Sequence, residues 1–569
     1  MEDIAMKKHL ARLLVVSLLA ASFLLTSCKS GSGDSSPTPS GNSSETSTVS
    51  NNSSGADSST PSADQPYDLP IVTDGSVTIS ISSPDCKVKG YSYTDGLPVW
   101  TKLEEETGIK IDWQVTPSSD YDSVIQTQLA AGVDLADFID VPDGSPMKYV
   151  NDGLIVPITE QLEKYGYYTQ QYFEANPYAK AFVTGPDGEI YFFGSDIAGS
   201  YMTDPGTWMI REDWLEKFDL DMPETLDDWY NCWKTFLEQD ANGNGERDEI
   251  PFLTSDIVGA FGNTYGLNTD IESNGWMVDE NGKVQYGYAQ PELKEFLAWA
   301  NKLYSEGLIS QDFANRDADT TNKQLGQGLV GSTTSLVNYI AQYNKLLASS
   351  NIDGKYVAVP TPPKKDANSD PSIVPIGGPT VLTWGFSKDC DDLDTKFKFI
   401  DYCYASQSAV YGMCFGIEGQ SYEIGSDGLP VYTSYALDNP DMGMTSVIRS
   451  LGGMPYFPFT RALNGYWSHG VLQTNKEDPE LTQAAENMQP YLTQAFPRRM
   501  LMTEDETATY GQYMSDIETR VKEMMVNFVM GRESLDKFDD YVDGLYSMGL
   551  DKVLEVRQAQ YDRYLEALK

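Results

Sequence analysis

The segment that most constrains this chain is Asp240–Pro251, which reads DANGNGERDEIP. Oxygen-bearing side chains recur at alternate positions as Asp240, Asn242 and Asn244, and two intervening glycines allow the positive φ angles of a tight turn. A loop curled in this way turns several oxygens toward one point, and Ca²⁺ takes roughly six to eight oxygens at about 2.3–2.6 Å. The segment therefore predicts a calcium-binding loop. A glycine-rich surface loop without metal is the alternative.

This loop begins like an EF-hand loop but ends differently. Its D-x-N-x-N-G start places Glu246 where an EF-hand donates a backbone carbonyl, whereas the twelfth residue is Pro251 and not a bidentate Glu. The adjacent carboxylates of Asp248 and Glu249 are the expected substitutes. Together with Asp240 they bring three negative charges, which favours a divalent cation.

The clearest helix of the chain directly precedes the loop. Thr225 is its expected N-cap, with Asp228 three residues later in a variant of the capping box. Its apolar face is formed at helical spacing by Leu226, Trp229, Tyr230, Trp233, Phe236 and Leu237. We interpret this face as core, so the ion is expected to fix the turn into a strand at 250–253 and not to perform chemistry.

The rest of the folded body alternates strands with helices. A strand at 76–82, a helix at 97–107, a strand at 109–115, a helix at 121–131 and a strand at 136–141 form a βαβαβ opening, which implies a parallel sheet. Further strands are expected at 208–210, 355–359 and 381–386, and further helices at 291–306, 336–348 and 393–405. Three helices near 510–529, 534–548 and 550–569 close the chain.

Residues 1–28 have the pattern of a bacterial secretory signal. Three basic residues precede an apolar run at 13–25 that is too short to span a bilayer stably. The run ends in Leu-Thr-Ser-Cys, which resembles a lipobox, so Cys28 is expected to carry lipid and to become the mature N-terminus. An ordinary signal with an incidental cysteine is the alternative, and either Met1 or Met6 could be the true start.

Residues 29–66 are rich in Ser, Thr, Gly, Asn and Pro, a composition that cannot bury enough apolar surface to fold. We interpret them as a flexible tether between the lipid and a folded body at 67–569. The sequence therefore predicts a protein at the extracellular face of the cell membrane, in contact with that membrane only through its anchor.

Composition excludes several functions. The net charge of −44 argues against nucleic acid or anionic lipid as partners, because both require basic patches. The chain has two histidines, one of them in the leader, which leaves little room for histidine-rich zinc sites or for many catalytic triads. With one of its six cysteines lipidated, five remain, and we expect these to be thiols that pack as small apolar groups without a disulfide framework.

Several motifs carry a resemblance to a known family. They are Trp208–Leu215 (WMIREDWL), Pro223–Asp228 (PETLDD), Asp240–Pro251, Leu303–Leu308 (LYSEGL), Tyr411–Gly419 (YGMCFGIEG) and Tyr541–Tyr561. On these residues the chain, over 70–569, resembles the family 1 extracellular solute-binding proteins of ATP-binding-cassette importers, in their lipoprotein branch. The alginate-binding periplasmic proteins belong to the same wider group.

The resemblance implies a fold and a metal site. The fold is α/β, with two periplasmic-binding-protein-like lobes, each a mostly parallel sheet flanked by helices, and a helical C-terminal region. A sugar oligomer would lie between the lobes of a monomer, which would deliver it to permease subunits. The implied ligands of a structural Ca²⁺ are the side chains of Asp240, Asn242, Asn244, Asp248 and Glu249 and the carbonyl of Glu246.

Sugars stack on Trp and Tyr, while carboxylates, amides and Arg bind their hydroxyls. Aromatic residues in loop-like settings are the better candidates for this role. The candidate ligand-binding residues are Trp276, Trp384, Tyr456 and Trp467, with Arg461 and Asp204 for polar contacts. For each of them a position in the core or on the surface is an equally good interpretation, and Trp384 fits a strand core.

Three functions remain open at this point. The first is a tethered receptor that binds an oligosaccharide and is not an enzyme. The second is a surface glycosidase that uses two carboxylates. With 84 acidic residues an Asp/Glu pair can always be found, so such a pair carries no weight. The third is a peptide or sensory receptor on the same fold.

Overall fold

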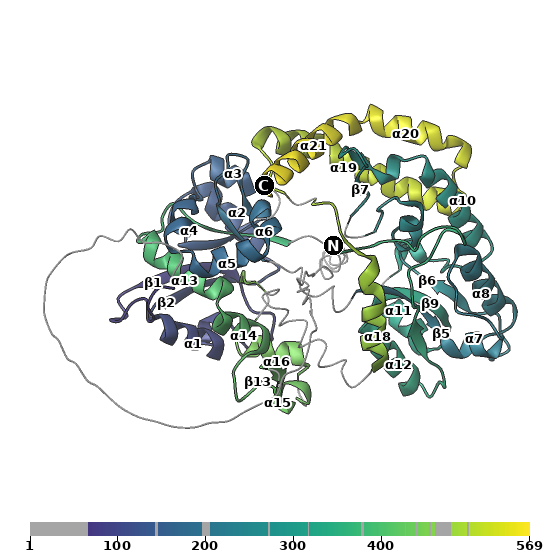
Figure 1. Cartoon of the computed structure of the whole chain (residues 1–569), viewed down its shortest axis with the longest axis horizontal. Coiled ribbons are helices and arrows are strands. Elements are labelled where there is room, and N and C mark those ends of the chain that lie inside the picture. Colours follow the sequence, from purple (N-terminus) through teal and green to yellow (C-terminus); the bar gives the residue numbers. More distant parts are fainter. Residues whose placement is uncertain are drawn as a thin grey trace, which may run out of the picture.

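The computed structural model shows two lobes side by side (Figure 1). It describes residues 66–142, 146–195, 205–270, 273–316, 318–376, 380–426, 428–439, 442–453, 457–460, 479–497 and 500–569. In this part of the chain, the first lobe is built on a five-stranded sheet of order β2-β1-β3-β12-β4, and the second on a four-stranded sheet of order β10-β5-β9-β6.

The first lobe combines an N-terminal stretch with a later one. Its strands are β1 (Thr78–Pro84), β2 (Lys110–Thr116), β3 (Phe138–Val141), β4 (Phe192–Ser195), β12 (Thr380–Phe386), β13 (Tyr422–Ile424) and β14 (Pro430–Tyr432). Its helices are α1 (Pro98–Thr107), α2 (Tyr121–Ala131), α3 (Pro146–Asn151), α4 (Thr159–Tyr165), α5 (Tyr167–Ala175), α6 (Pro177–Val183), α13 (Leu393–Ala405), α14 (Gln407–Phe415), α15 (Ser434–Leu437) and α16 (Met444–Ser450).

The second lobe is also built from two stretches of chain. Its strands are β5 (Gly206–Arg211), β6 (Ile250–Leu253), β7 (Trp276–Val278), β8 (Val284–Tyr286), β9 (Val330–Leu336), β10 (Tyr356–Ala358), β11 (Val374–Ile376) and β15 (Leu492–Gln494). Its helices are α7 (Glu212–Lys217), α8 (Leu226–Glu238), α9 (Ile257–Phe261), α10 (Glu292–Ser305), α11 (Ala318–Gly326), α12 (Tyr339–Ser349), α18 (Pro479–Met488), α19 (Glu504–Val529), α20 (Phe538–Ser547) and α21 (Leu550–Ala567).

The strand directions correct one expectation. The βαβαβ opening is confirmed, since β1 runs parallel to both β2 and β3. However, β12 is antiparallel to β3 and to β4, and in the second sheet β5 is antiparallel to β9 and β10 while only β6 and β9 are parallel. The two-lobed α/β fold therefore holds, but its sheets are mixed and not mostly parallel. In the first sheet the difference comes from β12, which returns after the chain has visited the other lobe, whereas in the second sheet the antiparallel strands β5, β9 and β10 belong to one stretch of chain.

The chain passes between the lobes at three places. It leaves β4 at Ser195 and enters β5 at Gly206, and it leaves β11 at Ile376 and enters β12 at Thr380. It leaves the first lobe again after Phe459, which is buried in that lobe's core, and enters α18 at Pro479. Each lobe is consequently completed by a segment that returns from the other one.

The C-terminal helices cover the second lobe and reach back to the first. In Figure 1, α19, α20 and α21 arch over one end of the second lobe, and α21 ends next to the first. There Phe182 of α6 meets Tyr564 of α21, with ring centroids 5.7 Å apart. Within the described ranges, no helix combines the length and the apolar composition that a membrane span requires.

A buried hydrogen-bonded chain joins α8, β9 and β6 beneath the 240–249 loop. The indole Nε1 of Trp233 donates to Ser332 Oγ at 2.7 Å, and Ser332 Oγ donates to the carbonyl of Pro251 at 2.7 Å. Trp233 and Ser332 are both fully buried. This hydroxyl therefore satisfies a donor and an acceptor that water cannot reach.

Replacement of the Ser332 hydroxyl tests whether this hydrogen-bonded chain stabilises the fold. Ser332→Ala leaves the Trp233 N–H and the Pro251 carbonyl unpaired, which costs about 1–3 kcal/mol. We expect a melting temperature lower by several degrees in thermal unfolding followed by circular dichroism. The control is Ser349→Ala, which removes an exposed hydroxyl that bonds only within α12 and should leave melting unchanged. Equal melting of the two variants would contradict this account.

Candidate functional site

The helix before the predicted metal loop forms as its sequence indicates. Thr225 Oγ1 accepts from the Asp228 N–H at 3.2 Å, and the Asp228 carboxylate accepts from the Thr225 N–H at 2.9 Å, which completes the capping box. Its Trp229, Trp233 and Phe236 are fully buried in the core of the second lobe. The helix end at Glu238 is thereby fixed, and with it the start of the loop.

The loop itself is a series of tight turns. Asp240 has a φ of 48°, and Gly243 and Gly245 have φ of 74° and 81°, so the predicted glycine positions are the ones that need positive φ. Asp240 Oδ2 accepts from the Gly245 N–H at 3.0 Å, and Asn242 Oδ1 accepts from the Asn244 N–H at 3.0 Å. Side-chain oxygens of the loop therefore fold it back on itself.

Lys217 of α7 holds the start of the loop from outside. Its Nζ donates to the carbonyl oxygens of Asp240 at 2.6 Å and Ala241 at 3.1 Å. The ammonium thus binds the backbone and leaves the carboxylate of Asp240 directed into the loop.

Two carboxylate oxygens in the loop are buried without a donor. Asp240 Oδ1 and Glu249 Oε2 have no hydrogen-bond partner among the described residues, and Glu249 is 5% exposed. Asp248 differs, because its Oδ1 accepts from the side-chain amides of Asn242 at 2.8 Å and Asn244 at 3.0 Å. Buried carboxylates without donors are costly unless a cation compensates them.

The carboxylates of this loop are too few to bind a hard cation by themselves. Among the described residues, no group of three or more His, Cys, Asp and Glu side chains is arranged to hold a metal. A cation here would depend on Asp240 and Glu249 together with amide and backbone oxygens, which are ligands suited to Ca²⁺. The two orphaned oxygens are the structural observation in favour of such an ion.

Two of the predicted sugar-stacking residues belong to the cores. Trp276 begins β7, is 0% exposed, and lies 4.8 Å from the ring of Tyr286 and 5.0 Å from the Arg557 guanidinium. Trp384 lies within β12, is also 0% exposed, and packs 5.4 Å from Phe138. Neither indole has a free face for a sugar, so we no longer assign them to ligand binding. The interpretation of both as core residues is the one that their burial supports.

The other predicted residues fall outside the described ranges. They are the ligand-binding candidates Asp204, Tyr456, Arg461 and Trp467 and the lipidation candidate Cys28. The five other cysteines, at positions 86, 232, 390, 403 and 414, are free thiols. Cys232, Cys403 and Cys414 are buried, and burial raises the pKa of the Cys232 thiol to about 12, which makes it unreactive at neutral pH.

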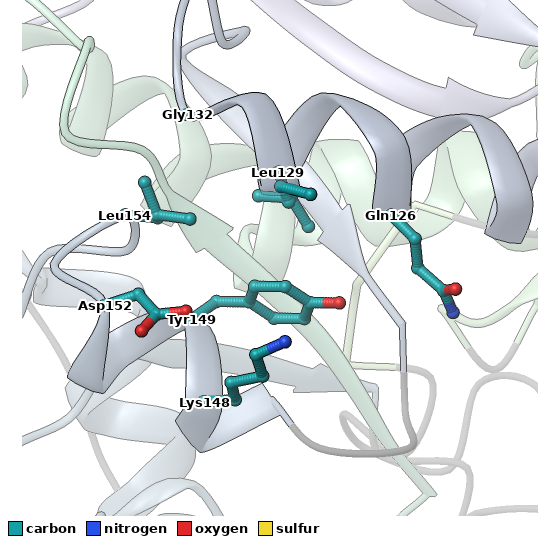
Figure 2. Close-up of a pocket in the computed structure, with 8 residues that line it drawn as sticks. Gln126, Leu129, Gly132, Lys148, Tyr149, Asp152 and Leu154 are labelled. Carbon is teal, nitrogen blue, oxygen red and sulfur yellow. The ribbon is translucent and has the colours of Figure 1, made fainter.

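A cavity that we did not predict from the sequence lies between α2 and α3 (Figure 2). It has a volume of about 520 Å³ and is lined by Gln126, Leu129, Ala130, Gly132, Lys148, Tyr149, Asp152 and Leu154. A signal for it was present in the sequence. Lys148 and Tyr149 follow the third strand of the βαβαβ opening, and ligands of open α/β sheets bind beyond the carboxyl ends of the strands.

The two-lobed body and its local motifs can now be compared with known proteins. The bacterial extracellular solute-binding protein family matches this chain over residues 94–410. The chain belongs to that family.

Two known proteins illustrate the similarity of this chain to its relatives. The fructooligosaccharide ABC transporter substrate-binding protein FusA of Streptococcus pneumoniae is 24% identical over 530 residues, which cover 85% of this chain and 94% of FusA. Lipoprotein LipO of Bacillus subtilis is 27% identical over 383 residues, which cover 64% of this chain and 71% of LipO.

Solved structures support the fold of this family member. The alginate-binding protein AlgQ2 without calcium ion has a TM-score of 0.65 and 23% identity, with 86% of this chain and 99% of AlgQ2 covered. An EF-hand mutant of FusA in complex with fructo-nystose has a TM-score of 0.66 and 22% identity over the same shares of the two chains. At this identity the likeness establishes the two-lobed fold.

Proposed function

We propose that this solute-binding protein is a lipid-anchored, monomeric receptor on the extracellular face of the cell membrane. It captures an oligosaccharide between its two lobes and delivers it to the permease of an ATP-binding-cassette importer. The observation that carries this proposal is the arrangement of the two lobes. Each lobe has its own main core, and the chain passes between the lobes three times, which suits closure of one lobe on the other.

An oligosaccharide is the ligand class that the relatives favour. FusA is named for fructooligosaccharides and spans most of this chain, and AlgQ2, named for alginate, shares its fold. The chief competing function is a glycosidase. It would need two carboxylates poised on either side of a sugar, whereas Asp240 and Glu249 sit in a loop between a helix and an edge strand, and neither lines the cavity between α2 and α3.

Calorimetry with a panel of glycans tests whether the protein is an oligosaccharide receptor. We expect saturable heat with at least one fructo-, galacto- or uronate-containing oligosaccharide, because a closing cleft buries most of its ligand. Chromatography of the same mixture after prolonged incubation should return the glycan intact. Cleavage products would favour the glycosidase, and saturable heat with peptides but with no glycan would favour a peptide receptor.

We further propose that the 240–249 loop binds a structural Ca²⁺. The residues that would hold it are Asp240, Asn242, Asn244, Asp248 and Glu249 through their side chains and Glu246 through its carbonyl. Support comes from the two buried carboxylate oxygens of Asp240 and Glu249 that lack donors. A bound cation would neutralise them and fix the turn between α8 and β6.

Removal of the ion should lower stability. At a Ca²⁺ concentration 100-fold above its dissociation constant, binding stabilises the folded state by about 2.7 kcal/mol, so excess chelator should lower the melting temperature by several degrees. Glu249→Gln should abolish this Ca²⁺-dependent shift. In chelator, the same variant should melt no lower than the parent, because it removes a buried, uncompensated charge.

Glu246→Gln is the matched control for this experiment. It makes the same charge change in the same loop, but the Glu246 side chain is exposed and only its carbonyl is a proposed ligand. It should keep the Ca²⁺-dependent shift. If complete demetallation, verified by elemental analysis, leaves the melting temperature of the parent protein unchanged, the site is refuted.

The anchor can be tested independently. We expect the full chain, expressed with its leader in a bacterium, to partition into the detergent phase of Triton X-114, because an acylated Cys28 carries two or more apolar chains. Cys28→Ala should move the protein to the aqueous phase, whereas Cys86→Ala should not. An aqueous parent protein, or a Cys28→Ala variant that stays in detergent, would rule out lipidation at this residue.

A further inference from the structure

Helix α6 contributes side chains to the cores of both lobes. Its Ala179 and Val183 are buried in the core of the first lobe. Ala181 and Phe182, on the same helix, are buried in the core of the second lobe, and Tyr178 packs against both cores. In Figure 1, α6 lies on the side of the first lobe that faces the second, next to the end of α21. This short helix therefore belongs to the first lobe by its place in the chain and to both lobes by its packing.

A second apolar side chain crosses between the lobes in the opposite direction. Leu501 lies shortly before α19 of the second lobe, but it is buried in an apolar cluster whose other buried members, such as Leu129 and Ile155, belong to the first lobe. Its neighbour Met500 is buried in the core of the second lobe. Two consecutive residues of the chain therefore pack into different lobes.

Adjacent residues of α21 hold both crossings. The ring of Tyr564 meets the ring of Phe182 at a centroid distance of 5.7 Å. The guanidinium of Arg563 donates to the Leu501 carbonyl at 3.4 Å, and it also forms a bidentate ion pair with Glu506 of α19, at 2.7 and 2.6 Å. The α21 helix is thereby fixed within the second lobe while it contacts the two side chains that cross.

These crossings limit how the lobes can move. Phe182 is 1% exposed and Leu501 is 6% exposed, so withdrawal of either would bring buried apolar surface into water. A ligand that closed the lobes in this way would have to supply the lost free energy through tighter binding to the closed state. Rotation about the crossings avoids this cost, because packed helices can slide by small amounts without separating.

We propose that α6, α21 and Leu501 form a pivot about which the lobes rotate, and that Phe182 and Leu501 are the positioning residues that keep its axis in place. The inference rests on the proposed receptor, because it specifies how that receptor closes. Since both side chains are buried, they act on ligand capture through the alignment of the lobes and not by contact with the ligand.

Distances between pairs of spin labels, measured by electron paramagnetic resonance, test this pivot. The pivot pair is Lys180→Cys with Asp562→Cys, at exposed positions of α6 and α21. The remote pair is Glu105→Cys with Lys345→Cys, at exposed positions of α1 and α12, which lie at the opposite end of the two lobes from α21 (Figure 1). In the free protein we expect a narrow distance distribution for the pivot pair and a broad one for the remote pair.

The native cysteines have to be kept free of label. Both pairs are therefore placed in a chain that also carries Cys28→Ala, Cys86→Ala and Cys390→Ala. Of the cysteines in the described part of the chain, only the buried ones at positions 232, 403 and 414 then remain.

Substitution of Phe182 separates a pivot from ordinary core packing. Phe182→Ala should broaden the remote distribution, because it loosens the axis, and the milder Phe182→Leu should broaden it less. Phe399→Ala is the matched control, since it removes an equally buried ring that packs only in the core of the first lobe. It should leave the remote distribution unchanged. Circular dichroism establishes which variants are folded, and Phe182→Leu decides the test if Phe182→Ala is not.

Addition of a glycan that gives saturable heat in the calorimetric panel extends the test to closure. The remote distance should then shift, while the pivot distance stays the same. A pivot distribution as broad as the remote one in the free protein, or a remote distribution that substitution of Phe182 leaves unchanged, overturns the pivot. If no glycan of the panel binds, the receptor is contradicted, and the measurements on the free protein still decide whether the pivot exists.

Discussion

The insertion of β12 between β3 and β4 is the constraint on which the molecule depends. Thr383 to Phe386 pair with β3 on one side, and Trp384 and Gly385 pair with β4 on the other. In the described part of the chain, β4 has no other partner in the sheet. Because β12 arrives only after the chain has formed most of the second lobe, the first lobe cannot be completed without the second.

The two lobes are therefore coupled by the path of the chain, and each has its own main core, although Ala181 and Phe182 of α6 pack into the core of the second lobe. One core gathers around Trp384 and Phe138, and the other around Trp233 and its neighbours on α8. Densely packed cores move as rigid bodies, and the connections between them allow the lobes to rotate. This combination is what a receptor needs to enclose a ligand and release it. Contacts such as that of Phe182 with Tyr564 can then bias the relative position of the lobes.

Local features of the structure could be predicted from the sequence, and non-local ones could not. The periodicity of residues 121–131 and 393–405 gave both helices with their exact ends, and the capping box of α8 formed as expected. The turns of the 240–249 loop were predictable for the same reason, since its interacting oxygens lie within ten residues. Strand direction was predictable only in the βαβαβ opening, where helices connect successive strands. Elsewhere it was not, because alternation identifies a strand without indicating its neighbour.

The predicted ligand-binding residues show the same limit of sequence-based prediction, because their exposure depends on non-local contacts. Trp276 follows a glycine with a φ of 83° and resembles a loop residue in the sequence, but Arg557, from the far end of the chain, covers its ring. Conversely, Lys148 and Tyr149 form an ordinary short helix in sequence, and only the packing of α2 against it creates a cavity. Such contacts between residues far apart in the sequence decide which aromatic rings are open to a sugar.

Small-angle X-ray scattering on the free and the glycan-saturated protein tests the central claim most directly. The claim is that two rigid lobes close on an oligosaccharide. The account predicts a smaller radius of gyration at saturation, with occupancy confirmed by calorimetry under the same conditions, and no such change with a glycan that gives no heat. An unchanged radius of gyration at full occupancy would contradict closure between the lobes.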